Sequence, residues 1–247
     1  MLLQLATMFG YFPASIEDAD ASIDSLLYYQ EKLLTGWTSD YWPIDDKDMA
    51  QFPGAAPDVI NHCVLSLFSL SFYYRADVAM IAKNHYEMSR KGWPALDYTS
   101  DYVKRYDVLS MMGDQPCVDR KIRLAVISAE ITEGHSNSES FGGVLSRLDR
   151  NLFDVTYILL TETVYAHQSI ASFTKAHHSD KVYIWAKEER DAANGSTWLT
   201  RWGKEIGEME LDIIFYTDLT MSNLARRLGM MRLAPIQINS HGHPMTR

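Results

Sequence analysis

The sequence predicts an α/β protein in which a Rossmann-like parallel sheet with flanking helices follows an α-helical leader. Between residues 15 and 92 the apolar positions recur at helical spacing, whereas residues 118–247 alternate short apolar runs with longer amphipathic segments. Runs that are apolar on both faces and separated by helices are typical of parallel strands in a sheet covered on both sides. We therefore expect a helical leader over residues 1–117 and a Rossmann-like domain over residues 118–247.

The leader shows helical periodicity between residues 15 and 92. Three prolines, Pro43, Pro53 and Pro57, interrupt it. Because proline disfavours a helix interior, they predict a loop between two helices. A further helix is expected over residues 76–91.

Five strands and four helices are expected in the second domain. The predicted strands span residues 122–128, 153–160, 181–185, 211–216 and 234–239. The predicted helices lie near residues 139–150, 164–177, 187–209 and 220–231. Right-handed connections would make this sheet doubly wound. Ligands of open α/β sheets bind beyond the carboxyl ends of the strands, so the loops there are the candidate sites.

The charge balance disfavours a nucleic-acid partner. The chain carries 23 basic and 32 acidic side chains, a formal charge of 23 − 32 = −9, which repels a phosphate backbone. The segment richest in basic residues, Arg226 to Arg232, holds three arginines and is expected to form one helix face. With 47% hydrophobic and 22% charged residues, the composition is that of an ordinary globular protein.

The cysteines and the amino terminus point to a cytoplasmic or nuclear location without a membrane partner. Cys63 and Cys117 are far apart and suggest neither a disulfide framework nor a zinc site, so a reducing compartment is expected. The apolar opening MLLQLATMFGYF is too short to cross a bilayer and lacks the features of a signal peptide. The sequon at Asn194 is expected to be turn chemistry.

The loop after the first predicted strand is one candidate site. It reads AEITEGHSNSESFGG and places His135, Ser136, Asn137 and Ser138 ahead of a helix. Small polar residues at a helix start can cap the helix, and they can also hydrogen-bond a phosphate, a sugar or an acceptor hydroxyl. Both interpretations stay open at this point.

The loops after the fourth and fifth predicted strands are the other candidates. In TDLTMSN, Asp218 can accept a hydrogen bond from a ligand hydroxyl or serve as a helix N-cap. In SHGHPMTR, Gly242 permits close approach of the backbone to a ligand, Pro244 stiffens the turn, and His241 and His243 offer donors near a leaving group. A His-x-His pair can also bind a metal, but no third ligand is evident and no metal is expected.

Several common motifs are absent from the sequence. It contains no GxGxxG phosphate loop, no P-loop and no GxSxG nucleophile elbow, which removes the usual support for dinucleotide, kinase-type and hydrolase interpretations. An Asp-x-Asp occurs at Asp46 to Asp48 and is expected to be a solvated loop of the leader rather than a metal site.

Two stretches of the second domain resemble the O-linked N-acetylglucosamine transferases and their SPINDLY-like and bacterial relatives. The first is LDIIFYTDLTMSNLARRLGMMRLAPIQINSHGHPMT, residues 211–246. It has the family's order of strand, loop, helix ending in an Arg-Leu-Ala-Pro-type motif, and Gly-His-Pro loop. The second, residues 121–160, resembles the family's opening strand, its His-bearing loop, and the helix and strand that follow.

The resemblance implies the amino-terminal half of a GT-B fold, whose sugar nucleotide lies between two Rossmann-like halves. It implies that His135 lies near the sugar and the acceptor as a catalytic residue. It also implies that Gly242, His243 and Pro244 form a loop against the donor sugar. The polar chemistry of the loops adds Ser136, Asn137 and Asp218 as expected substrate contacts. No metal cofactor is implied.

The implied reaction transfers N-acetylglucosamine or a related sugar from a uridine diphosphate donor to Ser or Thr hydroxyls of an acceptor protein. The family's second half carries most donor contacts and is absent from these 247 residues, so we expect little or no turnover by this chain alone. Two alternatives stay open: a truncated, non-catalytic interaction module, and a small nucleotide-sugar binder without transfer chemistry.

Overall fold

The computed structural model describes residues 79–92, 94–111, 119–129, 131, 136–161, 179–186, 197–219 and 222–240, together with Asp24, Leu27, Tyr28 and Glu31. The chain divides into two units, Met1–Leu96 with Met245–Arg247, and Asp97–Pro244. In the first unit, helix α5 (Ala79–Gly92) agrees with the helix predicted over residues 76–91. Most of the predicted leader and the predicted helix 164–177 lie outside the described residues.

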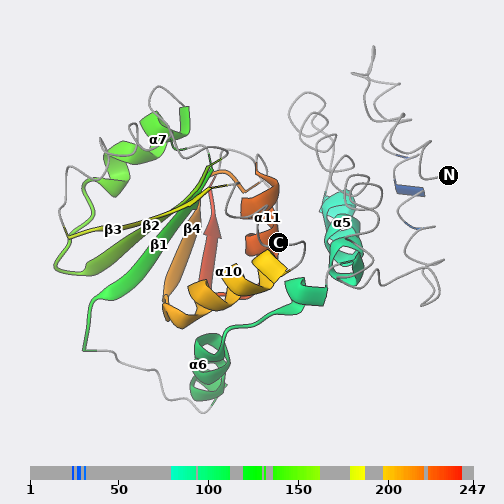
Figure 1. Ribbon diagram of the computed structural model, residues 1–247, viewed down its shortest axis with the longest axis horizontal. Coiled ribbons are helices and arrows are strands. Elements are labelled where there is room, and N and C mark those ends of the chain that lie inside the picture. Colours follow the sequence, from blue (N-terminus) through cyan, green and yellow to red (C-terminus); the bar gives the residue numbers. More distant parts are fainter. Residues whose placement is uncertain are drawn as a thin grey trace. The chain divides into compact units, whose positions relative to one another are not determined.

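The second unit contains a five-stranded, fully parallel sheet in the order β3-β2-β1-β4-β5 (Figure 1). The strands are β1 (Ile122–Ser128), β2 (Phe153–Thr161), β3 (Lys181–Ala186), β4 (Ile213–Tyr216) and β5 (Ile236–Asn239). The predicted α/β class and all five predicted strands are confirmed. β4 and β5 each begin two residues later than predicted.

Helices cover both faces of the sheet (Figure 1). Helix α7 (Ser136–Leu145) packs on one face, where Phe141 meets Phe215 of β4 edge to face at 5.4 Å between ring centroids. Helix α10 (Thr197–Glu208) packs on the other, where Trp202 stacks on Trp185 of β3 at 4.5 Å. Helix α11 (Asn223–Met230) contacts α10. This two-sided cover explains why the strands are apolar throughout.

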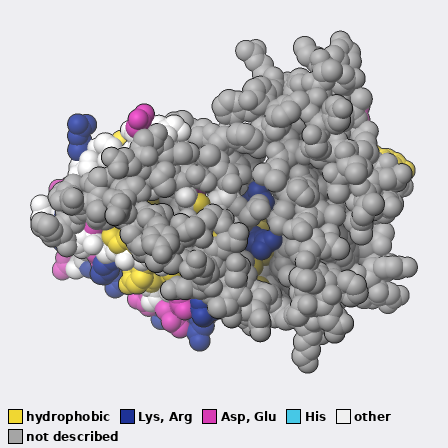
Figure 2. Space-filling model, turned by 45° about the horizontal axis from the view of Figure 1, so that its top comes forward, with side chains coloured by type: hydrophobic (Ala, Val, Ile, Leu, Met, Phe, Trp, Pro, Cys, Tyr) yellow, Lys and Arg dark blue, Asp and Glu magenta, His cyan; other side chains and the backbone are white. Residues whose placement is uncertain are grey.

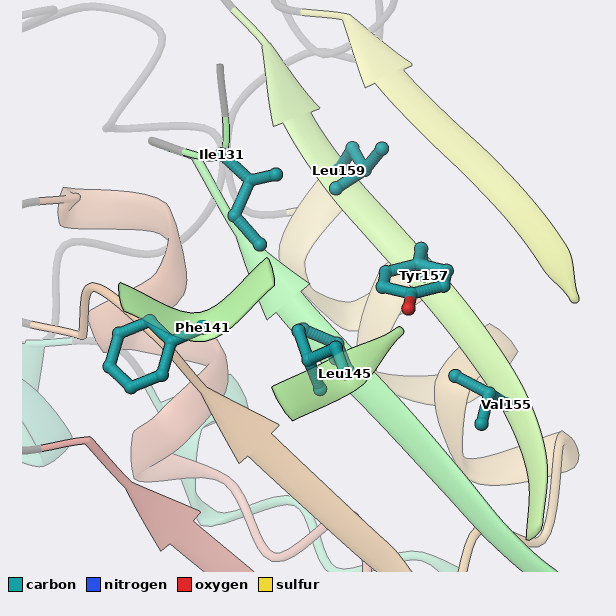
Figure 3. Packing of buried hydrophobic residues seen from close by; sticks show 7 residues of the cluster. Ile131, Phe141, Leu145, Val155, Tyr157 and Leu159 are labelled. Atoms are coloured by element: carbon teal, nitrogen blue, oxygen red, sulfur yellow. The ribbon is translucent and has the colours of Figure 1, made fainter. Parts of the chain in front are cut away.

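A buried cluster joins α7 to the centre of the sheet (Figure 3). Phe141 and Leu145 lie one turn apart on α7, and alternate residues of β2 face them. The cluster comprises Val126, Ile131, Phe141, Leu145, Val155, Tyr157 and Leu159. The apolar positions of α7 and the apolar residues on the facing side of β2 therefore pack into one core.

Helix α10 approaches its neighbours closely through two glycines. A Cβ added at Gly207 would lie 2.9 Å from the Cβ of Ser100 and 2.9 Å from the hydroxyl of Tyr98. A Cβ added at Gly203 would lie 2.8 Å from the sulfur of Met231. Real Cβ contacts are not this short, so a side chain at Gly207 would displace Ser100, whereas one at Gly203 would displace the flexible Met231 side chain.

Gly143→Ala is expected to be more stable than Gly207→Ala by about 1–3 kcal/mol, the usual cost of overpacking. Both substitutions gain helix propensity, since both glycines lie inside helices. Only the Cβ at Gly207 meets other atoms, because nothing lies within 4 Å of the Cβ position at Gly143. Urea denaturation of the two variants measures the difference, and equal stabilities would contradict the close packing of α10.

Helix α6 (Asp101–Met111) belongs to the sheet-containing unit. The hydroxyl of Ser100 accepts a hydrogen bond from Val103 N at 3.2 Å and so caps the helix. The adjoining backbone is held against the α11–β5 connection, because Ser100 N donates to Arg232 O at 2.9 Å and Arg232 N donates to Tyr98 O at 3.0 Å. Ser100 followed by Asp101 is a recognisable helix start that the sequence reading did not use.

Charged networks lie at the amino-terminal ends of the strands. Asp212, which precedes β4, accepts two hydrogen bonds from Arg120, at 2.6 and 2.8 Å, and one from Arg123 N at 2.8 Å. It also accepts one from the hydroxyl of Tyr102 on α6. Burial and this carboxylate raise the pKa of Tyr102 to about 12. Burial opposes ionisation of Asp212, but the hydrogen bonds from Arg120, Tyr102 and Arg123 outweigh it and lower the Asp212 pKa.

A second charged network joins the amino-terminal ends of β2 and β3. The Arg150 guanidinium donates to both carboxylate oxygens of Asp180, from Nε at 2.7 Å and from Nη2 at 2.6 Å. It also donates to the carbonyls of Leu145 and Leu148, at 3.0 and 2.8 Å. Arg150 therefore satisfies carbonyls at and just after the end of α7. This helix ends at Leu145 rather than at the predicted residue 150.

Candidate functional site

The strand order reverses between β1 and β4. The chain runs from β1 to β2 to β3 in one direction and then returns to β4 on the other side of β1. Helix α7, which follows β1, lies on one face of the sheet, and α11, which follows β4, lies with α10 on the other. In open α/β sheets such a reversal opens a crevice at the carboxyl ends of the two strands, where ligands bind.

A hydrogen-bonded cluster links the carboxyl ends of β1 and β4, where the strand order reverses. The Asp218 Oδ2 atom accepts hydrogen bonds from the hydroxyl of Ser128 at 2.8 Å and from Ala129 N at 2.6 Å. The Thr217 hydroxyl donates to the Ser128 hydroxyl at 2.7 Å. The Asp218 residue is only 1% exposed. The cluster thus holds a buried carboxylate among neutral donors.

The same cluster extends to β5. The Ser240 hydroxyl donates to Thr217 O at 2.7 Å, and Ser240 N donates to Tyr216 O at 3.0 Å. We call the five residues Ser128, Ala129, Thr217, Asp218 and Ser240 the strand-end network. It connects the carboxyl ends of three adjacent strands, from which the predicted loops with His135, Asp218 and His243 depart.

The alternative in which Asp218 caps the following helix is wrong. The N-cap of α11 is Ser222, whose side chain accepts from Ala225 N at 3.3 Å. In its described contact with this turn, the backbone carbonyl of Asp218 accepts from Ser222 N at 3.2 Å. Its described carboxylate contacts instead reach across to β1, which is a partner distant in sequence.

The predicted site residues fall into two groups. Ser136 and Asn137 form the first turn of α7, with Ser136 exposed and Asn137 buried, so the helix begins three residues before the predicted residue 139. His135, Gly242, His243 and Pro244 lie outside the described residues, and their roles remain predictions. Among the described candidates, Asp218 is hydrogen-bonded directly to Ser128, and Thr217 links Ser240 to the same cluster.

The three arginines of the segment 226–232 do not form one helix face, contrary to the prediction. Arg226 of α11 is buried, at 3% exposure, whereas Arg227 is partly exposed. Burial, with a smaller contribution from Arg227, lowers the pKa of Arg226 to about 9, so the guanidinium stays charged at neutral pH. Arg232 lies beyond the helix end and pairs with Asp107 of α6 at 2.9 Å.

Sequence reasoning missed Ser128 and Ser240. Both are buried hydroxyl residues at or just beyond the carboxyl end of an apolar strand. That position is the available signal, because a hydroxyl that ends a buried strand of a parallel sheet lies at the ligand-binding edge. In the sequence, Ser128 stands out only as the last residue of the apolar run IRLAVIS.

Neither a metal centre nor a membrane span emerges from the described part of the chain. Within it, no group of three or more His, Cys, Asp or Glu side chains could hold a metal ion. No described helix is long and apolar enough to span a bilayer. On the face shown in Figure 2, acidic and basic side chains of the described residues lie interspersed.

Comparison with known proteins gives no sequence match and a distant structural one. No protein-family model matches the chain, and no curated protein matches it. Among solved structures, it is similar to a mutant of the Thermobaculum terrenum O-GlcNAc transferase, with 14% sequence identity and a TM-score of 0.43. The similarity covers 91% of this chain but 39% of that one. The sheet order and strand directions themselves establish the Rossmann-like α/β fold.

Proposed function

We propose that the chain supplies one Rossmann-like half of a glycosyltransferase catalytic module. The full module would transfer N-acetylglucosamine or a related sugar from a uridine diphosphate donor to Ser or Thr hydroxyls of proteins. The observation that carries the proposal is the adjacency of β1, β4 and β5, which brings together the starts of the loops that resemble the transferase family. That edge is where α/β sheets bind nucleotide ligands.

The proposed chemistry divides between positioning and charge stabilisation. As the sugar leaves, the diphosphate gains negative charge, and preorganised backbone N–H groups, helix termini or cations stabilise that charge more than they stabilise the ground state. In this proposal His135 lies at the reacting centre, and Ser136, Asn137 and the loop of Gly242, His243 and Pro244 contact the substrate. No metal ion takes part.

Asp218 requires a modified role in this proposal. Its Oδ2 atom already accepts two hydrogen bonds from the protein, and the residue is buried. A carboxylate held in this way shapes the site more readily than it binds a sugar hydroxyl. Direct substrate contact is therefore assigned to the residues that follow in the three loops.

Isothermal titration calorimetry of residues 1–247 is expected to show preference for uridine diphosphate over adenosine diphosphate. One Rossmann-like half supplies only part of a two-lobed cleft, so affinity is expected on the order of 1 mM, equivalent to about 4 kcal/mol. His243→Ala is expected to weaken binding of the uridine diphosphate sugar, because the loop of Gly242, His243 and Pro244 is proposed to contact the donor sugar. Glu205→Gln, on the exposed face of α10, should leave it unchanged.

Equal binding of the two nucleotides would remove the support for a uridine-dependent transferase and favour a general nucleotide binder. Absence of binding to either nucleotide would favour the interaction module. Transfer of labelled sugar by the chain alone would show that this half suffices for turnover, contrary to the expectation.

A further inference from the structure

We propose that Asp218 is a positioning residue that sets the spacing of the carboxyl ends of β1, β4 and β5. It acts through the strand-end network rather than by touching a ligand. The inference rests on the described contacts alone and does not depend on the proposed function.

The network begins where the backbone pairing of β1 and β4 ends. The two strands pair in parallel from Leu124 and Ile213 to Ile127 and Tyr216. The last described backbone bond between them is donated by Thr217 N to Ile127 O at 3.3 Å. From there on, the described links between the two strand ends are made by side chains.

The Asp218 Oδ2 atom holds the chain at two points, the last residue of β1 and the residue that follows it. It accepts from the side chain of Ser128, the last residue of the strand, and from the backbone of Ala129, the first residue of the following loop. Hydrogen bonds to a carboxylate are stronger than those between neutral groups. The direction in which the chain leaves β1 is therefore tied to β4, although the two segments are 89 residues apart in sequence.

The β5 end is tied to the same unit through Thr217. Its hydroxyl donates to Ser128, and its carbonyl accepts from the Ser240 hydroxyl. Thr217 and Asp218 are adjacent and both buried, so a displacement of one moves the other. Three loop origins thus share one hydrogen-bonded element.

The other end of β4 provides a matched control. Asp212 precedes the strand, as Asp218 follows it, and its carboxylate also accepts a hydrogen bond from a backbone N–H of β1, that of Arg123 at 2.8 Å. Both residues therefore connect β4 to β1 through a carboxylate, at opposite edges of the sheet.

Amide hydrogen exchange of the full chain, measured residue by residue by NMR without any ligand, tests the proposal. In Asp218→Ala the Ala129 amide is expected to exchange roughly tenfold to a hundredfold faster, the equivalent of a lost charge-assisted hydrogen bond. The Arg123 amide should keep its wild-type rate. Asp212→Ala is expected to give the reverse pattern.

Asp218→Asn, which retains an acceptor oxygen, should restore part of the protection at Ala129. If Asp218→Ala does not fold, Ser128→Ala is measured instead. It removes one of the two described hydrogen bonds that hold the Asp218 Oδ2 atom, and the Ala129 amide is expected to exchange faster. Uniform acceleration across all strands, or an unchanged Ala129 amide, would overturn the proposal. Because no nucleotide is present, neither result depends on the transferase assignment.

Discussion

Arg150→Ala is expected to lower the free energy of unfolding by about 3–5 kcal/mol, the usual cost of breaking a buried ion pair. The substitution leaves the Asp180 carboxylate without its guanidinium, and that side chain is 1% exposed. It also removes the donor to the Leu145 and Leu148 carbonyls at the end of α7. Chemical denaturation followed by circular dichroism measures the loss.

A second ion pair between β2 and β3 provides the control. Lys181 and Asp154 are joined at 3.3 Å, but their side chains are 57% and 37% exposed. Lys181→Ala should therefore cost less than about 1 kcal/mol. The double variant Arg150→Met with Asp180→Leu should be more stable than Arg150→Ala, because no charge is left buried and unpaired. If Arg150→Ala costs no more than Lys181→Ala, the pair does not stabilise the fold.

Trp202→Ala is expected to lower the free energy of unfolding by about 3–5 kcal/mol. Trp202 is 1% exposed and is among the largest fully buried side chains of the described residues. Truncation removes the buried apolar contacts of the indole ring and leaves a cavity. It also abolishes the stacking of Trp202 on Trp185 of β3. Urea denaturation gives the magnitude, and near-ultraviolet circular dichroism reports the loss of the stacked pair.

Tyr183, two residues before Trp185 on β3, provides the matched aromatic control. It is 42% exposed, so Tyr183→Ala should cost clearly less than Trp202→Ala. Trp202→Phe retains part of the apolar volume and is expected to fall between them. Similar losses for Trp202→Ala and Tyr183→Ala would show that α10 does not anchor its face of the sheet through this side chain.

The sheet could be predicted from the sequence because its strands are short apolar runs, and the central strand β1 is buried on both faces over Leu124–Ser128. A parallel strand between helix layers is an apolar run, and such runs are visible without knowledge of their partners. The starts of β4 and β5 were less well predicted, since Asp212 precedes β4 in a side-chain network and Pro235, before β5, has no N–H to donate. These limits arise from interactions that apolar periodicity does not encode.

The candidate site could be predicted only in part. The rule that ligands bind beyond parallel strands selects the loop of Asp218, and the structure places this loop at the reversal of strand order. The local alternative, an N-cap, failed because the carboxylate bonds to residues 89 and 90 positions away. Ser222, four residues after Asp218, caps the helix instead. Long-range polar contacts of this kind have no local signature.

The amino-terminal and carboxyl-terminal ends of the strands differ in chemistry, and this affects how freely the residues at each end can be substituted. The described ion pairs that tie strands together gather where the strands begin, as in Arg120 with Asp212 and Arg150 with Asp180. The strand-end network, at the carboxyl ends of the strands, relies on hydroxyls and one carboxylate. Substitutions at the carboxyl ends of the strands thus leave the ion pairs at the amino-terminal ends intact. In α/β barrels the same separation of the two ends keeps activity apart from stability.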